Sequence, residues 1–470
     1  MREIEFSFGD ERLKYRAEKC FSKLMLNPSA SFPKVFSHSS ELEGFYRFIN
    51  NPRASYEEIS DAVKVQSLGS ILKQKEVLAI HDTTHVVPNS KTESIKEFSW
   101  RKGGFLAHVS LLASARQSHE DDRRELFGVG ALTLWSRTGP RLKPGSTNER
   151  RCWLDHVKIL EEDCPEQTEY IHVMDREGDM YPLWSELMQK RDDGRQMIAR
   201  FVIRAKCNRT VVGDNVSGAA LLFEHMKEAP VLASRKVFVS RREENPCPRS
   251  QKTHPAREKG REAKLLISAC RVEIKRAETS TVKKRSPFPT TTLNVVRVFE
   301  ENFEPKNKEN LIEWILLTTE PIESAEQVLK IVDIYKARWT IEEFFKAVKT
   351  GCKIEERLLS DAQAWYKLFA LCLPVGCQLL NLRLASNDPL EVDLLERKYL
   401  SHQQWEILQL KSGEYRIRLE HYSDAQALIA RMGGHIKSNG PPGWITLFRG
   451  FQELLQIEKG WILARTHRDM

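Results

Sequence analysis

The chain lacks the sequence features that mark several common protein classes. Its nine cysteines are scattered, with no Cys-x-x-Cys pair and no Cys/His zinc spacing, which argues against a redox motif or a zinc finger. The N-terminal ten residues are charged and hold no apolar signal region, and no stretch is long and apolar enough to span a bilayer. Internal repeats and low-complexity tracts are also missing. These absences predict a cytoplasmic protein without a membrane segment.

The composition is that of a globular protein with a modest excess of positive charge. The 470 residues are 41% hydrophobic and 29% charged, and 73 basic against 65 acidic residues give a net charge of +8. This length allows about two to four domains and a sizeable core. The charge suits a polyanionic partner such as DNA, but it is equally compatible with an ordinary basic protein.

The N-terminal residues 1–70 have the pattern of short helices. Asp10 is a candidate N-cap, apolar residues follow at helical spacing, and Asn27-Pro28 ends the run. Residues 39–52 place another apolar stripe on one side of a helix that stops at Pro52. This pattern fits a small DNA-binding module or a plain helical cap on the next domain.

Beyond residue 70 the sequence alternates short apolar runs with helical segments, which predicts a mixed α/β sheet. Residues 207–309 are β-rich with Ser, Thr and Pro between the runs, and are interpreted as an insertion in that domain. Within it, residues 241–264 are predicted to be an exposed loop. The residues from 361 onward are largely helical and end in a long apolar stripe.

Two acidic residues stand at the ends of apolar runs. Asp82 follows VLAIH and Asp175 follows YIHVM. Loops after the carboxyl ends of sheet strands commonly hold the functional groups of α/β proteins. Aspartate is also common at strand ends because it caps turns, so each acid alone has that plainer interpretation.

Residues 335–349 are predicted to form one helix that carries charge and aromatic rings on a single face. Tyr335, Arg338, Glu342 and Lys349 recur at spacings that bring them to one side, and Trp339 flanks them. Glu343 points elsewhere. The alternative is a solvated charged face whose aromatic edges contact the core.

Three carboxylates of this kind suit phosphodiester chemistry. Two divalent ions about 4 Å apart can activate a water nucleophile and stabilise the leaving oxyanion. Mg²⁺ prefers hard oxygen ligands. Neighbouring cations can hold phosphate and aromatic rings can stack on unpaired bases.

At these residues the chain resembles bacterial insertion-sequence DDE transposases, and within them the Tyr-Arg-Glu-Lys signature subgroup typified by the Tn-five transposase. The signature is complete in YKARWTIEEFFKAVK, while HDTTHV and VMDREGDMY are similar to the blocks of the first and second aspartates. GFYRFINNP, KGGFLAHVSLL, RFVIRAK and PPGWITLFRGFQ resemble further family blocks in the same order. Residues 207–309 depart from the family pattern.

The resemblance implies an RNase H-like mixed-sheet catalytic core of α/β class with a β-rich insertion and helical domains at both ends. The implied domains are a helical DNA end-binding domain (1–70), the catalytic core (71–206 and 310–360), the insertion (207–309) and a helical C-terminal dimerisation region (361–470).

The resemblance also assigns roles to residues. Asp82, Asp175 and Glu342 would be the catalytic, metal-binding triad for two Mg²⁺ ions, with Mn²⁺ as a substitute. The implied DNA contacts are Tyr335, Arg338, Lys349, Trp314, Trp339 and Arg204. Trp314 would stack on a flipped base, although packing in a strand is its alternative role.

The implied function is cut-and-paste transposition by a homodimer that joins two transposon ends to target DNA at the nucleoid. Strand cleavage, a hairpin intermediate and strand transfer would all use one site. Two alternatives remain from the sequence: an RNase H-like nuclease that cuts without joining, and a transposase-derived regulator that only binds DNA.

Overall fold

The computed structural model divides the chain into two compact units. The first unit combines residues 1–169 with 339–470, and the second comprises residues 170–338. The described residues are 4–88, 104–116, 124–136, 149–188, 199–212, 220–239, 245–246, 253–254, 260–278, 286–301, 312–359, 361–384, 400–436, 438 and 442–466.

The first unit begins with four helices, as the sequence predicts: α1 (Glu11–Leu26), α2 (Phe32–Val35), α3 (Ser39–Ile49) and α4 (Tyr56–Ile71). Asp10 caps α1 by accepting a hydrogen bond from the Arg12 amide at 2.8 Å. Ser55 and Glu58 form a reciprocal capping box at the start of α4. The apolar faces of α1 and α3 are buried, with Phe21 and Phe48 among their core residues. The stripes found in the sequence therefore mark the inward sides of these helices.

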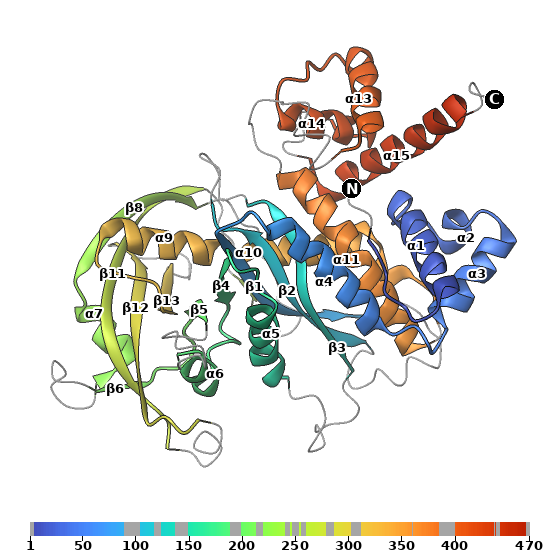
Figure 1. The fold of residues 1–470 in the computed structure, drawn as a ribbon. Helices are drawn as coiled ribbons and strands as arrows, with labels where there is room; N and C mark the ends of the chain where they lie inside the picture. The colour runs from blue at the N-terminus through green and yellow to red at the C-terminus, as the bar shows by residue number, and fades with distance from the viewer. Residues whose placement is uncertain are drawn as a thin grey trace. The chain divides into compact units, whose positions relative to one another are not determined.

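The sheet of the first unit has three antiparallel strands: β1 (Glu76–Val86), β2 (Phe105–Ser114) and β3 (Leu126–Trp135). Helices α4 and α11 (Ala362–Leu384) both pack against β3, although they are far apart in sequence (Figure 1). Helix α5 (Arg151–Glu162) packs against β2 and β3. The chain thus brings its N-terminal and C-terminal segments onto one sheet.

The rest of the first unit is helical, as predicted. It contains α10 (Trp339–Lys346), a π-helical turn η2 (Ala347–Gly351), a 3₁₀ turn η3 (Ile354–Glu356), α13 (His402–Tyr415), α14 (Tyr422–Met432) and α15 (Trp444–Thr466). Helices α13 and α14 pack against α15, which buries Leu447, Phe448, Phe451, Leu454 and Leu455.

The second unit is built on a mixed sheet in the order β4-β5-β13-β12-β11-β6-β7, with β8 also paired to β11. Strands β4 and β5 run parallel and the other pairs run antiparallel. The strands are β4 (Glu169–Met174), β5 (Arg200–Arg204), β6 (Thr210–Val212), β7 (Ala220–Leu221), β8 (Val231–Val239), β11 (Arg261–Lys275), β12 (Thr290–Glu300) and β13 (Glu313–Thr318).

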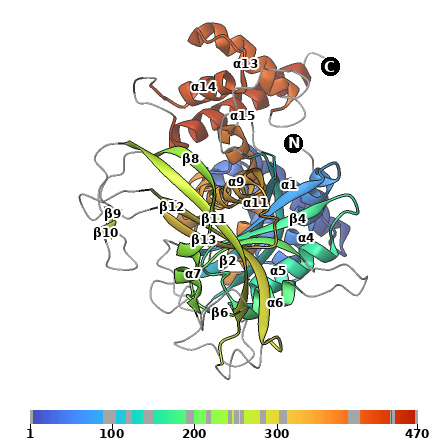
Figure 2. The ribbon, with the colours of Figure 1, turned by 90° about the vertical axis from the view of Figure 1, so that its left-hand side faces the viewer.

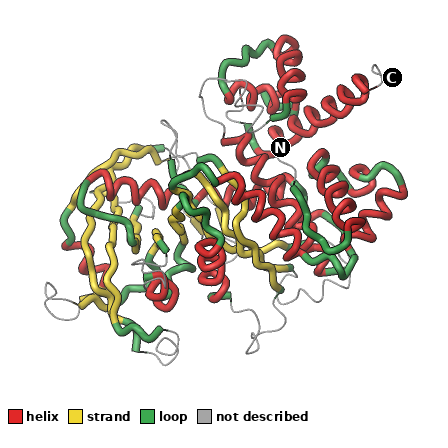
Figure 3. Tube along the Cα trace, in the orientation of Figure 1, coloured by secondary structure: helices red, strands yellow, loops and turns green. Residues whose placement is uncertain are grey.

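Among the described residues of this unit, helices α6, α7 and α9 accompany the sheet. Helix α6 (Tyr181–Leu187) follows β4, α7 (Leu222–Glu228) contacts β11, and α9 (Ala325–Lys336) crosses the strands β5, β8, β11 and β12. Figure 2 shows the long β11–β12 pair, and Figure 3 shows how strands dominate this part of the chain. Arg235 of β8 forms an ion pair with Asp333 of α9, which holds that helix on the sheet.

The mixed α/β class predicted from the sequence is confirmed, and residues 207–309 contain mainly strands where they are described. Most of the predicted loop 241–264 lies outside the described residues, apart from the two short strands β9 (Asn245–Pro246) and β10 (Thr253–His254) and the start of β11. The four-domain division stays a prediction. Among the described helices, none combines the length and apolar character needed to cross a membrane.

Candidate functional site

Asp82 lies within β1 rather than at its end. The sequence predicts that the strand stops at Asp82, but pairing with β2 continues to Val86, and Asp82 itself pairs with Val109. The strand changes character there, since residues 77–81 are buried and residues 82–85 are partly exposed. The Thr83 amide donates to Asp82 Oδ1 at 2.7 Å. A rigid, paired strand therefore presents this carboxylate at the point where β1 reaches solvent.

Glu342 lies in the first turn of α10, which packs against β1. Its neighbour Glu343 is engaged differently: its carboxylate accepts from Lys346 at 2.5 Å and from Arg383 of α11 at 2.6 Å. The pair with Arg383 ties α10 to α11. Glu343 therefore has a structural role in this unit, and Glu342 stays the residue predicted to bind a metal ion.

Residues 335–349 do not form one helix. Helix α9 ends at Lys336, a turn spans residues 337–338, α10 begins at Trp339, and Lys349 lies in the π-helical turn η2. The prediction of one helical face is wrong because it assumed 3.6 residues per turn throughout. Tyr335 and Arg338 belong to the second unit, whereas Trp339, Glu342 and Lys349 belong to the first.

Lys349 is fixed to the strand that carries Asp82. Its Nζ donates to the His85 carbonyl oxygen at 2.6 Å and lies 3.8 Å from Glu355 Oε1. Glu355 in turn accepts from the Val87 amide at 3.0 Å. Within the first unit, the tertiary contacts therefore bring η2 and the end of β1 together.

In the second unit, Asp175 directly follows β4, as predicted. Its Oδ1 accepts from the Glu177 amide at 2.7 Å, which is an Asx turn. Asp179 in the same loop is almost fully buried, where it pairs with Arg209 at 2.6 Å and accepts the Lys206 amide at 2.6 Å. Asp179 fixes the loop, while Asp175 is partly exposed at its start.

Cations and a tyrosine surround the end of β5 in the second unit. Arg204 donates to the Glu313 carbonyl oxygen at 3.2 Å. Burial lowers the pKa of Arg204, while Tyr335 raises it and Arg176 and Arg338 lower it. Burial raises the pKa of the Tyr335 hydroxyl, against the effect of Arg204 and Arg338. The three arginines and Tyr335 thus form an anion-attracting cluster, of which only Arg176 was not predicted from the sequence.

The two tryptophans have different settings. Trp314 lies in β13, as predicted, and its ring meets the edge of the Tyr335 ring at a centroid distance of 5.3 Å. Trp339 at the start of α10 is 55% exposed, with Lys346 Nζ 5.7 Å from its ring centroid. Trp314 is thus an aromatic member of the cationic cluster, and Trp339 has a face that can stack on a ligand.

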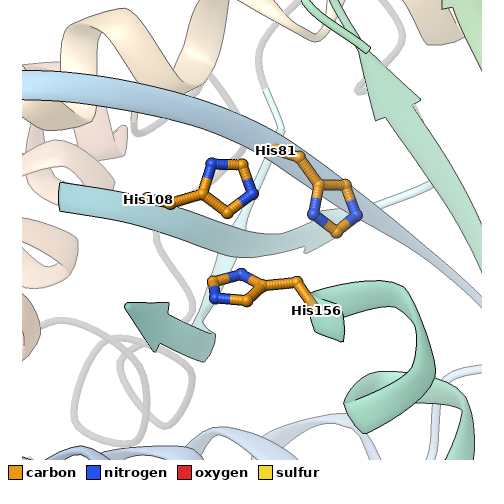
Figure 4. A group of neighbouring side chains, drawn as sticks. All are labelled: His81, His108 and His156. Carbon is orange, nitrogen blue, oxygen red and sulfur yellow. The ribbon is translucent and has the colours of Figure 1, made fainter. Parts of the chain in front are cut away.

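A buried histidine cluster behind Asp82 was not found from the sequence. His81 of β1, His108 of β2 and His156 of α5 turn their rings toward one another (Figure 4), with ring nitrogens within 4.8 Å. Ser110 Oγ lies 2.8 Å from Nδ1 of both His81 and His156. Thr83 Oγ1 lies 2.9 Å from His108 Nδ1. In the sequence, His81 and His108 each lie inside an apolar run, and this was the signal that could have indicated buried histidines.

These rings form a neutral hydrogen-bonded network. Burial lowers the pKa of His156 to about 3 and that of His108 well below its ordinary value. The spacing could admit a metal ion, but hydroxyls already occupy four of the ring nitrogens and the group contains no carboxylate or thiolate. Binding of a divalent ion there would displace these hydrogen bonds and bury its charge among neutral groups, which is unfavourable.

The donor set that fits a divalent metal is therefore the carboxylates. Asp82 and Glu342 in the first unit, and Asp175 in the second, are each partly exposed oxygen donors on ordered elements. Such donors suit Mg²⁺, which keeps several waters while carboxylates bind it. Metal ions held by carboxylates are suited to phosphoryl transfer.

Two family models match this chain. Residues 3–54 match Transposase DNA-binding, and residues 182–376 match Transposase DDE domain. The second match contains Glu342 and all six predicted DNA contacts, whereas Asp82 and Asp175 precede it. The chain thus carries a DNA-binding segment and a catalytic domain of nucleic-acid enzymes. Both matched models describe transposase domains, which supports a DNA-cleaving transposase enzyme.

A solved structure with some similarity is described as "Cryo-EM structure of piggyBac transposase synaptic complex with hairpin DNA (SNHP)". The sequence identity is 10%, the TM-score is 0.34, and the match covers 80% of this chain and 66% of that chain. The chain therefore spans just under two thirds of that protein's length. A likeness at this level adds nothing to the argument from the residues.

Proposed function

We propose that this protein is a cut-and-paste DNA transposase of the Tyr-Arg-Glu-Lys signature subgroup, acting on the ends of an insertion sequence. The observation that carries the proposal is the packing of α10, with Glu342, against β1, with Asp82. Those two acids belong to the HDTTHV and YKARWTIEEFFKAVK motifs. The matched DNA-binding and DDE domains support the same function.

The proposed catalytic core is RNase H-like, with Asp82, Asp175 and Glu342 acting together as ligands of two Mg²⁺ ions, for which Mn²⁺ substitutes. The ions supply a nucleophile at neutral pH and neutralise charge on the transferring phosphoryl group. The three carboxylates would hold these ions. Strand pairing of Asp82 and the Asx turn at Asp175 limit the rotamers of these side chains, which favours preorganised catalysis.

Each chemical step is an in-line displacement at phosphorus. Water first attacks one strand at the transposon end, and the phosphorus–oxygen bond to the leaving 3′-oxygen breaks. The freed 3′-hydroxyl would then attack the phosphorus of the opposite strand. The bond from that phosphorus to the 3′-oxygen of the flanking strand would break, so a hairpin forms on the transposon end and the flanking DNA leaves with a 3′-hydroxyl. A second water opens the hairpin, and the same hydroxyl attacks target DNA.

The cationic cluster of the second unit is proposed to bind the DNA next to the reacting phosphate. Arg204, Tyr335 and Arg338 would contact phosphates, and Trp314 would stack on the base displaced during hairpin formation. Lys349 and Trp339 would add contacts from the first unit. Guanidinium groups suit this role because their fork of donors matches phosphate oxygens.

The proposed assembly is a homodimer that holds two transposon ends, with residues 361–470 as the dimerisation region and residues 1–70 as the end-binding region. Its partners are double-stranded transposon ends and target DNA, and we place the protein in the cytoplasm at the nucleoid.

The test is a transposition reaction with purified protein, Mg²⁺ and labelled DNA carrying the sequences that flank its own coding region. We expect end cleavage, and we expect precut ends to be joined to target plasmid. Cleavage without joining would favour the nuclease alternative. Binding that leaves supercoiled plasmid closed at all metal concentrations would favour the regulator and refute the proposal.

A further inference from the structure

Two buried cations hold the N-terminal segment against the C-terminal part of the first unit. Arg357, just after η3, is 5% exposed, and its guanidinium donates to the carbonyl oxygens of Pro28 and Ala30. It also donates to the Cys352 carbonyl oxygen at 2.9 Å and lies 5.1 Å from the centroid of the Phe32 ring. Arg357 thus clamps the turn between α1 and α2.

Lys367 of α11 makes the second clamp. It is 2% exposed, and its Nζ donates to the carbonyl oxygens of Ile49 at 3.1 Å and Asn51 at 2.7 Å. These carbonyls lie at the C-terminal end of α3, where the helix dipole favours a positive charge. The end of α3 is therefore fixed to the N-terminal part of the long helix α11.

The pairing partners of both cations are neutral backbone oxygens. Burial lowers the pKa of Arg357 and of Lys367. Buried charges are poor sources of stability but strong sources of specificity, because only one arrangement satisfies them. A purely apolar contact would allow the N-terminal helices to shift. The four hydrogen bonds from Arg357 and Lys367 to carbonyl oxygens are directional and oppose such a shift.

The segment that carries Arg357 also contacts the strand of Asp82. We define the bridge segment as residues 347–357. Near its start Lys349 donates to the His85 carbonyl oxygen, and near its end Glu355 accepts a hydrogen bond from the Val87 amide. Arg357, its last residue, binds the turn after α1. The bridge segment therefore connects residues 3–54, which match the DNA-binding family, to the end of β1.

We propose that Arg357 and Lys367 are positioning residues that fix the DNA-binding segment relative to Asp82 and Glu342, so that the protein itself sets the distance between the recognised sequence and the cleaved phosphodiester. This inference rests on the proposed function. Its physical basis is that a small misplacement of the reacting groups has a large kinetic effect, about 100-fold for 1 Å.

The experiment compares wild type with the double variant Arg357→Met/Lys367→Met. The readouts are affinity for a labelled end, the position of each cut at nucleotide resolution, and nicking of plasmid without end sequences. We expect end affinity within about 3-fold of wild type and nicking to persist. Single-turnover cleavage at the correct phosphate should fall about 100-fold, with cuts appearing at neighbouring phosphates.

Two further variants keep the test decisive. Lys411→Met removes a lysine that pairs with Glu414 of the same helix, α13, and should cut like wild type. Lys367→Gln retains a hydrogen-bond donor without the positive charge. If the double variant does not fold, Lys367→Gln is used in its place. It should then cut at fewer wrong phosphates than the double variant would.

A folded variant without the Lys367 or Arg357 cation that cuts only at the wild-type phosphate, at the wild-type rate, would overturn the positioning role. Failure of the proposed function would look different, because wild type itself would then leave its ends uncut.

Discussion

The carboxylates of the two units occupy different surroundings. In the first unit, Asp82 and Glu342 lie on a strand and a helix that pack together, and the nearby cation Lys349 is committed to a carbonyl oxygen of the same strand. In the second unit, Asp175 stands near a group of arginines around Tyr335. The first setting suits binding of a metal ion, and the second suits binding of an anion such as a phosphate.

The same contrast recurs between neighbouring acids within each unit. Glu343 and Asp179 are saturated by ion pairs and backbone amides, whereas Glu342 and Asp175 are partly exposed at the ends of their loops or helices. The difference teaches that acids adjacent in sequence divide into structural and chemical roles. Each pair supplies its own matched control.

The largest effect is expected for the acids of the first unit. Glu342→Gln should lower the rate of DNA cleavage roughly 10³-fold, because bound metal ions supply several kcal/mol of transition-state stabilisation. End affinity and the thermal midpoint should stay near wild type. Glu343→Gln is the control, and it should retain cleavage while losing the ion pairs with Lys346 and Arg383. Equal rates for the two variants would remove Glu342 from the site.

In the second unit, substitutions of Asp175 and Asp179 should differ in their effect on the free energy of unfolding. Asp179→Asn leaves the half-buried Arg209 without its charge partner and should reduce the free energy of unfolding by about 3–5 kcal/mol, measured by urea denaturation. Asp175→Asn should leave that free energy unchanged and lower cleavage roughly 10³-fold. If Asp175→Asn also unfolds the protein, its carboxylate has a structural role and the contrast fails.

Acid should destabilise the first unit more steeply than the second. The first unit buries His108 and His156, and the second buries His172. Burial lowers the pKa of His156 and of His172 to about 3, and that of His108 well below its ordinary value. As pH falls, these histidines take up protons in the unfolded chain before they do so in the folded protein. Their burial as neutral rings therefore costs no stability above pH 6.5, and the free energy of unfolding decreases as pH falls from 6.5 toward 3.

For each buried histidine, the free energy of unfolding should decrease by about 1.4 kcal/mol for every pH unit below the ordinary pKa of the ring. Amide hydrogen exchange, corrected for intrinsic rates, should therefore show a steeper loss of protection with acid in β2 than in β5. His156→Gln should reduce the steepness in β2. Parallel losses in the two units would count against a separate histidine network in the first.

The smallest effect concerns the cationic cluster. Arg338→Ala should reduce the slope of log binding constant against log salt concentration by about 1, since one phosphate contact is lost. Arg297→Ala provides the comparison, because Arg297 pairs with Glu313 at 2.9 Å. A binding titration at several salt concentrations measures both slopes. An unchanged slope for Arg338→Ala would place that residue outside the DNA contact.

Local signals were enough for many of the elements. Asp10 and Asn27-Pro28 mark the limits of α1, and the apolar run before Asp175 ends where β4 ends. These predictions depended on capping and periodicity, which act over a few residues. The prediction that Asp82 ends its strand was wrong, because ladder pairing with β2 extends β1 through polar positions that a periodicity argument treats as a turn.

The sequence alone could predict only part of the candidate site. The sequence identified the acids and cations, but the single helix over residues 335–349 was wrong, because the turn after Lys336 and the π-helical winding of η2 interrupt it. Contacts such as that of Lys349 with the His85 carbonyl oxygen join residues far apart in the chain. No local pattern encodes such a pair.

By itself the sequence determined the kind of chemistry available, since residue types and motif order depend on the chain alone: three candidate carboxylates, a set of cations and aromatic rings, and the blocks similar to transposases. Only the tertiary structure decided which acids are saturated by partners, which histidines share a buried network, and how Arg357 and Lys367 hold the N-terminal helices. The reason is physical: burial, desolvation and long-range hydrogen bonds arise from packing between distant segments.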